Sequence, residues 1–291
     1  MFARWGRSWE LVKASWAILR SDKELIIFPI ISAVGCFLVT ITFFIPMLVS
    51  GAFDKVGRNG SSGIGLGQLI ILFVFYFVTY TVIIFCSSAL VGAAMIRLDG
   101  GNPSLSDGFN IAKSRLPQIV GYALISATVG LILQLLSNAA RNNRNLVGAI
   151  VGQIIIGLLG AAWSIATFLA VPVLVVEGVG PIEAVKRSTV LLKQTWGEQL
   201  MGDFSIGGIF GLITLGVILL AVILGVLFIN VPALLILVIL VAVVAVVCLS
   251  IVSSALSAIF RAALYRYAHD GKTTDFYAPE MIQGAFKAKN G

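Results

Sequence analysis

Two ionisable side chains stand where a membrane protein would place chemistry. Asp203 opens an apolar run in "MGDFSIGG", and Arg261 lies inside another in "SSALSAIFRAALYRYAHDG". Ionisable groups are costly at membrane depth, so those that occur there often mark a pathway or a binding site. We expect Asp203 and Arg261 to pair with each other or to line a cytoplasm-facing cavity; an interfacial structural pair or a snorkelling arginine is the alternative.

The rest of the chain lacks the usual catalytic and metal-binding patterns. Its one histidine, His269, leaves little with which to build a histidine zinc site or a Ser–His–Asp set. The patterns HEXXH and GXSXG and a phosphate loop ending in Gly-Lys-Ser/Thr do not occur. Cys36, Cys86 and Cys248 lie in apolar runs without paired or metal spacing. We therefore predict no catalytic residue, metal or cofactor, and a protein that is not an enzyme.

Tryptophan and basic residues mark the segments expected at the membrane surface. In residues 1–23, an apolar stripe runs at helical spacing through Trp5, Trp9, Val12, Trp16 and Leu19. Tryptophan favours the boundary between lipid and water, so this helix should lie on the cytoplasmic leaflet with its basic residues near anionic headgroups. A structural collar around the span ends is the plainer interpretation. The predicted membrane-interface residues are Trp5, Trp9, Trp16, Trp196, Lys13, Arg20, Lys186 and Arg187.

The composition predicts the elements that position these side chains. Of the 291 residues, 59% are hydrophobic and 11% are charged, whereas soluble domains carry about 25% charged residues. Apolar stretches of ~20 residues are long enough to span a bilayer. We predict an all-α membrane protein whose six transmembrane helices lie at roughly 24–50, 66–97, 117–138, 146–176, 203–229 and 232–266.

The basic residues are distributed unevenly between the two sides of the predicted spans. Sixteen of the 20 Lys and Arg residues fall in the two terminal regions and in the loops at 97–115 and 177–200. The other four are Lys55, Arg58, Arg141 and Arg144. Because cytoplasmic loops carry the excess of Lys and Arg, both termini should be cytoplasmic in a multi-pass membrane protein.

Three similar segments indicate an internal repeat. "ELVKASWAILR" at 10–20 matches "EAVKRSTVLLK" at 183–193, and "DGFNIAKSRLP" at 107–117 follows the same pattern more weakly. Each would form a cytoplasmic amphipathic helix that precedes a hairpin of two spans. Two spans per unit keep every unit in one orientation, which gives a parallel repeat.

Acid–glycine pairs mark the end of each predicted repeat. They are Asp99-Gly100, Glu177-Gly178 and Asp270-Gly271, and glycine is the usual residue after the last helical turn. The units are then about 1–100, 101–178 and 179–271. Together they make a single membrane domain over 1–271, followed by a cytoplasmic C-terminal tail at 272–291.

The opening "SWELVKASWAILRSDKELIIFPIIS" and the ending "FYAPEMIQGAFKAK" resemble a family of uncharacterised prokaryotic integral membrane proteins. More loosely, "DGGNPSLSDGFNIAKSRL" and "GPIEAVKRSTVLLK" resemble the six-helix membrane domain attached to some glycerophosphodiester phosphodiesterases. The resemblance implies a six-helix membrane fold and a location in the prokaryotic cytoplasmic membrane. It implies no hydrolysis, since the catalytic barrel of those enzymes is not part of the similarity.

These observations favour a structural or lipid-interacting membrane component. Its expected partners are membrane lipids, with anionic headgroups on the cytoplasmic side, and a second copy or a larger membrane assembly, but not nucleic acid. The alternative is a channel or transporter with a cytoplasm-facing cavity near Asp203 and Arg261, which parallel repeats also permit.

Overall fold

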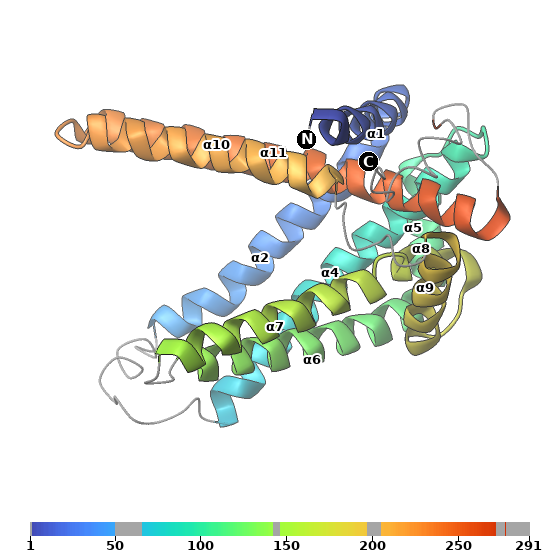
Figure 1. Ribbon diagram of the computed structural model, residues 1–291, viewed down its shortest axis with the longest axis horizontal. Coiled ribbons are helices and arrows are strands. Elements are labelled where there is room, and N and C mark those ends of the chain that lie inside the picture. The colour runs from blue at the N-terminus through green and yellow to red at the C-terminus, as the bar shows by residue number, and fades with distance from the viewer. Residues whose placement is uncertain (1, 50–65, 142–145, 197–204, 272–276, 278–291) are drawn as a thin grey trace. The chain divides into compact units, whose positions relative to one another are not determined.

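The described part of the chain is 91% helical. The computed structural model describes residues 2–49, 66–141, 146–196, 205–271 and 277, and contains no strand within them (Figure 1). The helices are α1 (Phe2–Ser21), the 3-10 turn η1 (Lys23–Ile26), α2 (Ile27–Val49), α4 (Leu66–Leu98), α5 (Leu105–Ser114), α6 (Leu116–Arg141), α7 (Leu146–Ala166), α8 (Ala170–Glu177), α9 (Pro181–Trp196), α10 (Ser205–Leu227) and α11 (Pro232–Asp270).

Six helical segments in the described residues are long and apolar enough to cross a membrane. They are Lys23–Pro46, Leu66–Leu98, Leu116–Arg141, Val147–Glu177, Gly207–Leu227 and Pro232–Asp270. The shortest has 21 residues and the longest 39, against the ~20 that a bilayer requires. The six predicted spans are confirmed as helices, with ends displaced by a few residues.

The described residues form two compact units. The first contains 1–30, 93–105 and 191–291, and the second contains 31–92 and 106–190. In the first unit, α10 packs along α11 and both contact α1. In the second unit, α6 packs along α7, where the Gln153 side-chain amide donates to the Ser137 carbonyl at 2.9 Å.

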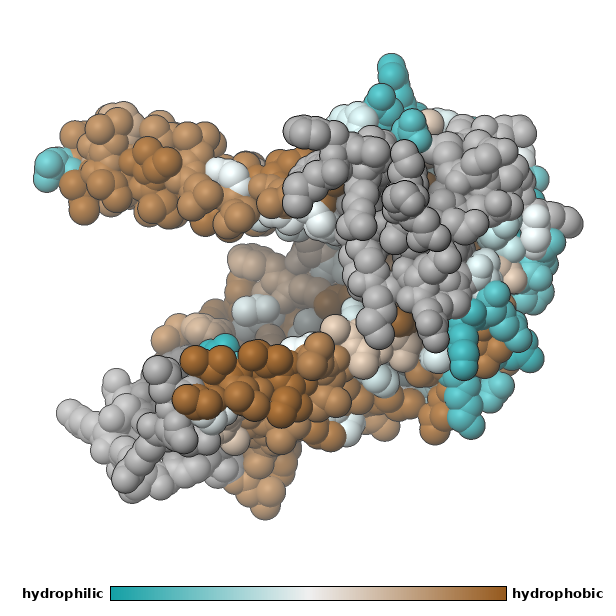
Figure 2. All heavy atoms as spheres, in the orientation of Figure 1, coloured by the Kyte–Doolittle hydropathy of each residue, from teal (hydrophilic) through white to brown (hydrophobic). Residues whose placement is uncertain are grey.

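Buried residues are confined to one end of the long helices. In α11, residues 232–254 include no buried position, whereas nine residues between Ala255 and Tyr265 are buried. In α4, burial begins at Ile84 and continues to Leu98. The exposed stretch of α11 would measure about 35 Å at 1.5 Å per residue, enough to cross a bilayer core of ~30 Å. Figure 2 shows a largely hydrophobic surface over the parts of α10 and α11 that are visible in it.

Span four is interrupted by Pro172. Proline lacks the N–H that would bond the carbonyl of Phe168 four residues earlier, and the chain leaves the α-helix between Ala166 and Ala170. Helix α9 compensates for the break, because the Leu169 N–H donates to Ser188 Oγ at 3.0 Å. Pro232, in contrast, starts α11 in its first turn, the position at which proline suits a helix.

The three acid–glycine pairs end helices as predicted. Gly100, Gly178 and Gly271 are the positive-φ residues of the described part, with φ of 87°, 67° and 66°. The Gly178 N–H donates to the Leu174 carbonyl at 3.1 Å, and the Gly271 N–H to the Tyr267 carbonyl at 2.9 Å. Glycine reaches this left-handed conformation without the steric cost of a β-carbon.

We predict that Gly178→Ala destabilises the protein more than Gly271→Ala. Both substitutions incur left-handed strain of about 1–2 kcal/mol. A β-carbon at Gly178 would also collide with the Arg115 guanidinium, whereas at Gly271 it meets no described atom within 4 Å. Thermal unfolding of both variants in detergent tests this difference. Equal midpoints would contradict the prediction and would show that the Arg115 guanidinium, at the end of a flexible side chain, moves aside at little cost.

Candidate functional site

Helix α1 presents a tryptophan–basic stripe to its surroundings. Trp9 and Trp16 are 49% and 48% exposed, and Lys13 and Arg20 are exposed as well. Steps of four, three and four residues place these four side chains within about 60° of one another around the helix axis. We call this set the α1 stripe. It combines two amphipathic aromatic rings with two positive charges on one face.

The opposite face of α1 is buried in the first compact unit. Leu11 is 3% exposed, and Ser15 and Ile18 are fully buried. Val12 and Leu19, which the sequence grouped with the tryptophans, are 7% and 4% exposed and lie at the edge of this buried face. The aliphatic residues of α1 are thus buried against other parts of the protein, whereas the Trp9 and Trp16 rings remain about half exposed.

Helix α9 carries the same spacing of exposed residues. Ile182, Lys186, Thr189 and Lys193 are exposed in steps of four, three and four. On the other side of α9, Ala184 and Ser188 are fully buried and Leu192 is 2% exposed. The basic residues Lys186 and Lys193 occupy the positions that Lys13 and Arg20 hold in the α1 stripe.

Helix α5 follows this division in a shorter form. Gly108 and Ala112 are buried, whereas Ser106, Asn110 and Lys113 are exposed. Small residues therefore occupy the buried centre of all three helices: Ser15 in α1, Ala112 in α5 and Ser188 in α9.

Several of the predicted site residues lie partly or wholly outside the described structure. Trp5 and Trp196 belong to α1 and α9, but their side chains are not described. Asp203 lies outside the described residues, so its pairing with Arg261 stays a prediction. Arg261 is partly buried in α11, between the buried Phe260 and Ala262.

Arginines cap the helix ends at two of the acid–glycine pairs. At the end of α4, Arg266 contacts the Asp99 carboxylate at 2.9 Å and donates to the Leu98 carbonyl. At the end of α8, Arg115 Nε donates to the Val175 carbonyl at 3.2 Å. The carbonyl end of a helix carries partial negative charge, so a nearby carboxylate is unfavourable unless a cation compensates it.

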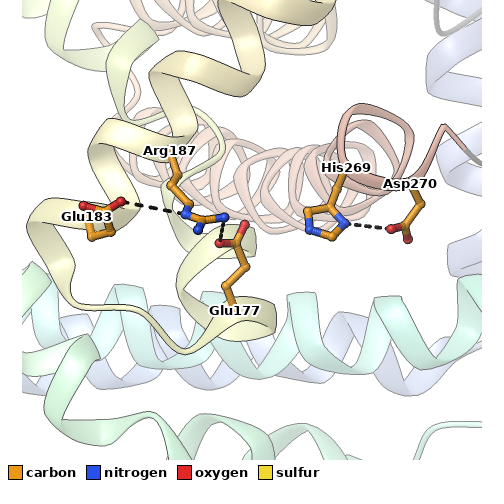
Figure 3. A network of polar contacts seen from close by, with 5 residues as sticks. All are labelled: Glu177, Glu183, Arg187, His269 and Asp270. Atoms are coloured by element: carbon orange, nitrogen blue, oxygen red, sulfur yellow. Dashed lines mark hydrogen bonds and ion pairs between the residues drawn. The ribbon is translucent and has the colours of Figure 1, made fainter.

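Arg187 pairs with the acidic residue of the second acid–glycine pair, Glu177-Gly178. Its guanidinium lies 2.7 Å from Glu177, which is 11% exposed, and 3.8 Å from Glu183 one turn earlier (Figure 3). The predicted interface residue Arg187 is therefore held in an ion-pair network although its side chain is 51% exposed, and Lys186 beside it is exposed as well. At the third pair, Asp270 contacts His269 Nδ1 at 2.7 Å.

The corner between α1 and α2 contains a buried carboxyl. Asp22 is 6% exposed, and its Oδ2 has no hydrogen-bond partner among the described residues. Burial raises the pKa of Asp22, although the Glu24 backbone N–H and the charge of Arg97 lower it. Arg97 is held by the Ser21 hydroxyl at 3.3 Å and by the Gly101 carbonyl at 3.3 Å. Sequence reasoning missed Asp22, since its burial and the nearby charge of Arg97 arise only in the folded chain.

The described residues contain no group of three or more His, Cys, Asp or Glu side chains that could hold a metal ion. Cys36, Cys86 and Cys248 are free thiols. The arrangement that this part of the chain does provide is a set of exposed basic and aromatic faces on helices whose other faces are buried.

Fold and surface together define the class of this molecule: it is an all-helical, multi-pass membrane protein. Residues 66–276 match the model of a family of unknown function, DUF6159, so the chain belongs to that family. A search of the curated proteins finds no match to it.

We predict that Asp22→Asn stabilises the protein at pH 7 and gains less at pH 4. A carboxyl whose pKa is raised by folding binds protons more tightly in the folded state, so stability falls as pH rises through that folded pKa. Asparagine removes this dependence. Thermal unfolding across pH 4–8 tests it, with Asp99→Asn as control, because Asp99 is 62% exposed and paired with Arg266. A loss of stability in Asp22→Asn at pH 7 would show that attraction to Arg97 outweighs desolvation.

Proposed function

We propose that this protein is a non-enzymatic structural component of the cytoplasmic membrane that interacts with lipid through its cytoplasmic helices. The α1 stripe is the observation that carries the proposal. Trp9 and Trp16 remain about half exposed although α1 buries its aliphatic residues. Tryptophan prefers the interface because its ring is apolar and its N–H can be hydrated.

The charge pattern favours anionic headgroups as the lipid partner. Lys13 and Arg20 flank the tryptophans of the α1 stripe, and Lys186 and Lys193 repeat the spacing on α9. A basic residue near an anionic bilayer surface contributes about 1 kcal/mol. Both termini would be cytoplasmic, since the excess of Lys and Arg lies on that side.

We further propose that the chain is built from three parallel repeats. The equivalent residues Leu11, Gly108 and Ala184 are all buried, as are Ser15, Ala112 and Ser188. Left-handed glycines follow the acidic residue at 100, 178 and 271. A shared register of buried positions supports a common hairpin unit, with an amphipathic helix leading each one.

We predict that anionic lipid stabilises the detergent-solubilised protein more than zwitterionic lipid. A ligand that binds only the folded state raises the unfolding midpoint, so phosphatidylglycerol should raise it more than phosphatidylcholine. Lys13→Gln with Arg20→Gln should weaken the phosphatidylglycerol effect by about 1 kcal/mol per side chain, or about fivefold in affinity for each.

Arg141→Gln is the matched control for Arg20→Gln. Arg141 is exposed at the far end of α6, where the charge distribution predicts the opposite side of the membrane. It should leave the lipid effect unchanged. Equal stabilisation by the two lipids would contradict the proposal. So would an equal loss of the phosphatidylglycerol effect in Arg20→Gln and Arg141→Gln.

A channel or transporter is the second candidate function. The observation that favours it is the interruption of span four between α7 and α8, because transporters often place binding sites at discontinuous helices. We expect any flux through such a protein in liposomes to fall in Asp203→Asn, with Asp270→Asn as control. The absence of flux across a broad panel of solutes would count against this function.

A further inference from the structure

Tyr277 is buried against residues that are far from it in sequence. It is fully buried in the first compact unit, and its phenol oxygen lies 2.6 Å from Ser15 Oγ, 262 residues away. Its ring lies beside Phe260 of α11, with centroids 6.4 Å apart. A residue of the C-terminal segment is therefore seated against the buried faces of α1 and α11.

The direction of this hydrogen bond follows from the protons available. A serine hydroxyl carries one proton, and Ser15 donates it to the Leu11 carbonyl at 3.0 Å. Tyr277 must then donate its phenol proton to Ser15 Oγ, which forms a chain from Tyr277 to Ser15 to Leu11. Burial raises the pKa of Tyr277, so the phenol keeps this proton at physiological pH.

The equivalent serine of α9 has a different kind of partner. Ser188 Oγ accepts the Leu169 N–H, which belongs to the span just before α9 in the chain. On α9, the serine hydroxyl contacts a backbone N–H that is nearby in sequence. On α1, the equivalent serine hydroxyl contacts the side chain of Tyr277.

We propose that the buried face of α1 around Ser15 is a docking site for the Tyr277 side chain of this chain. The contact fixes α1 to α11 and so sets the direction in which the α1 stripe faces. Tyrosine suits the site because its ring packs on Phe260 while its hydroxyl donates to Ser15. The docking itself stands on the contacts of Tyr277; its effect on lipid affinity rests on the proposed function.

Hydrogen–deuterium exchange of the full chain in nanodiscs tests this docking. Tyr277→Ala should accelerate amide exchange in α1 by about tenfold or more, because local opening becomes easier when buried contacts are lost. Tyr277→Phe keeps the ring and should produce a smaller acceleration. Exchange in α6 and α7 reports whether the variants remain folded. Ser188→Ala is the matched control and should affect α8 and α9 but not α1.

The outcomes separate the docking from the lipid function. Unchanged exchange of α1 in both Tyr277 variants would overturn the docking, whatever the lipid preference. Faster exchange of α1 in Tyr277→Ala, with α6 and α7 unchanged, would support it even in a protein that showed no preference for phosphatidylglycerol. If α6 and α7 exchanged as fast as α1 in both variants, the contact would be a general stabiliser and the proposal would fail.

Discussion

The rest of this structure depends on how the chain satisfies its backbone polar groups in a molecule with so little polar surface. Within lipid, carbonyl and N–H groups must be paired inside the protein, which selects helices for the spans. Unpaired backbone groups then remain at the helix ends, where the last carbonyls have no partner within the helix. Left-handed glycines with the arginines Arg115 and Arg266 provide donors at the ends of α8 and α4. At the break in span four the unpaired group is an N–H, and Ser188 Oγ accepts it from Leu169.

In α4, the polar contact of Arg266 with the Leu98 carbonyl lies at the same end of the helix as its buried residues. In α4 and α11, the C-terminal turns are buried, whereas the preceding turns expose apolar side chains. Lipid can cover an apolar helix surface, but it cannot pair a carboxylate or a carbonyl. Protein packing is therefore concentrated where the chain turns and charges gather. Helices α1 and α9 are two-sided, because each buries a small residue and leaves its basic residues exposed.

Local features of the sequence were predictable for physical reasons. The six spans follow from apolar length, and the three helix stops from glycine, since both depend on a few consecutive residues. The exposed tryptophans of α1 were also predicted. Val12 and Leu19 were grouped with them because the apolar residues span a broad arc of the helix. Only contact with other elements decides which part of that arc is buried. The Asp203–Arg261 pair stays a prediction.

By itself, the sequence determined the number of spans, their approximate ends, the residues at which helices stop and the uneven distribution of basic residues. These properties depend on local composition and on backbone conformation. The tertiary structure decided the partners of the buried polar groups. Arg266 reaches the Leu98 carbonyl 168 residues away, and Tyr277 reaches Ser15 across 262. No local pattern encodes such pairs, because they arise only when packing removes both groups from water and each must find a donor or an acceptor.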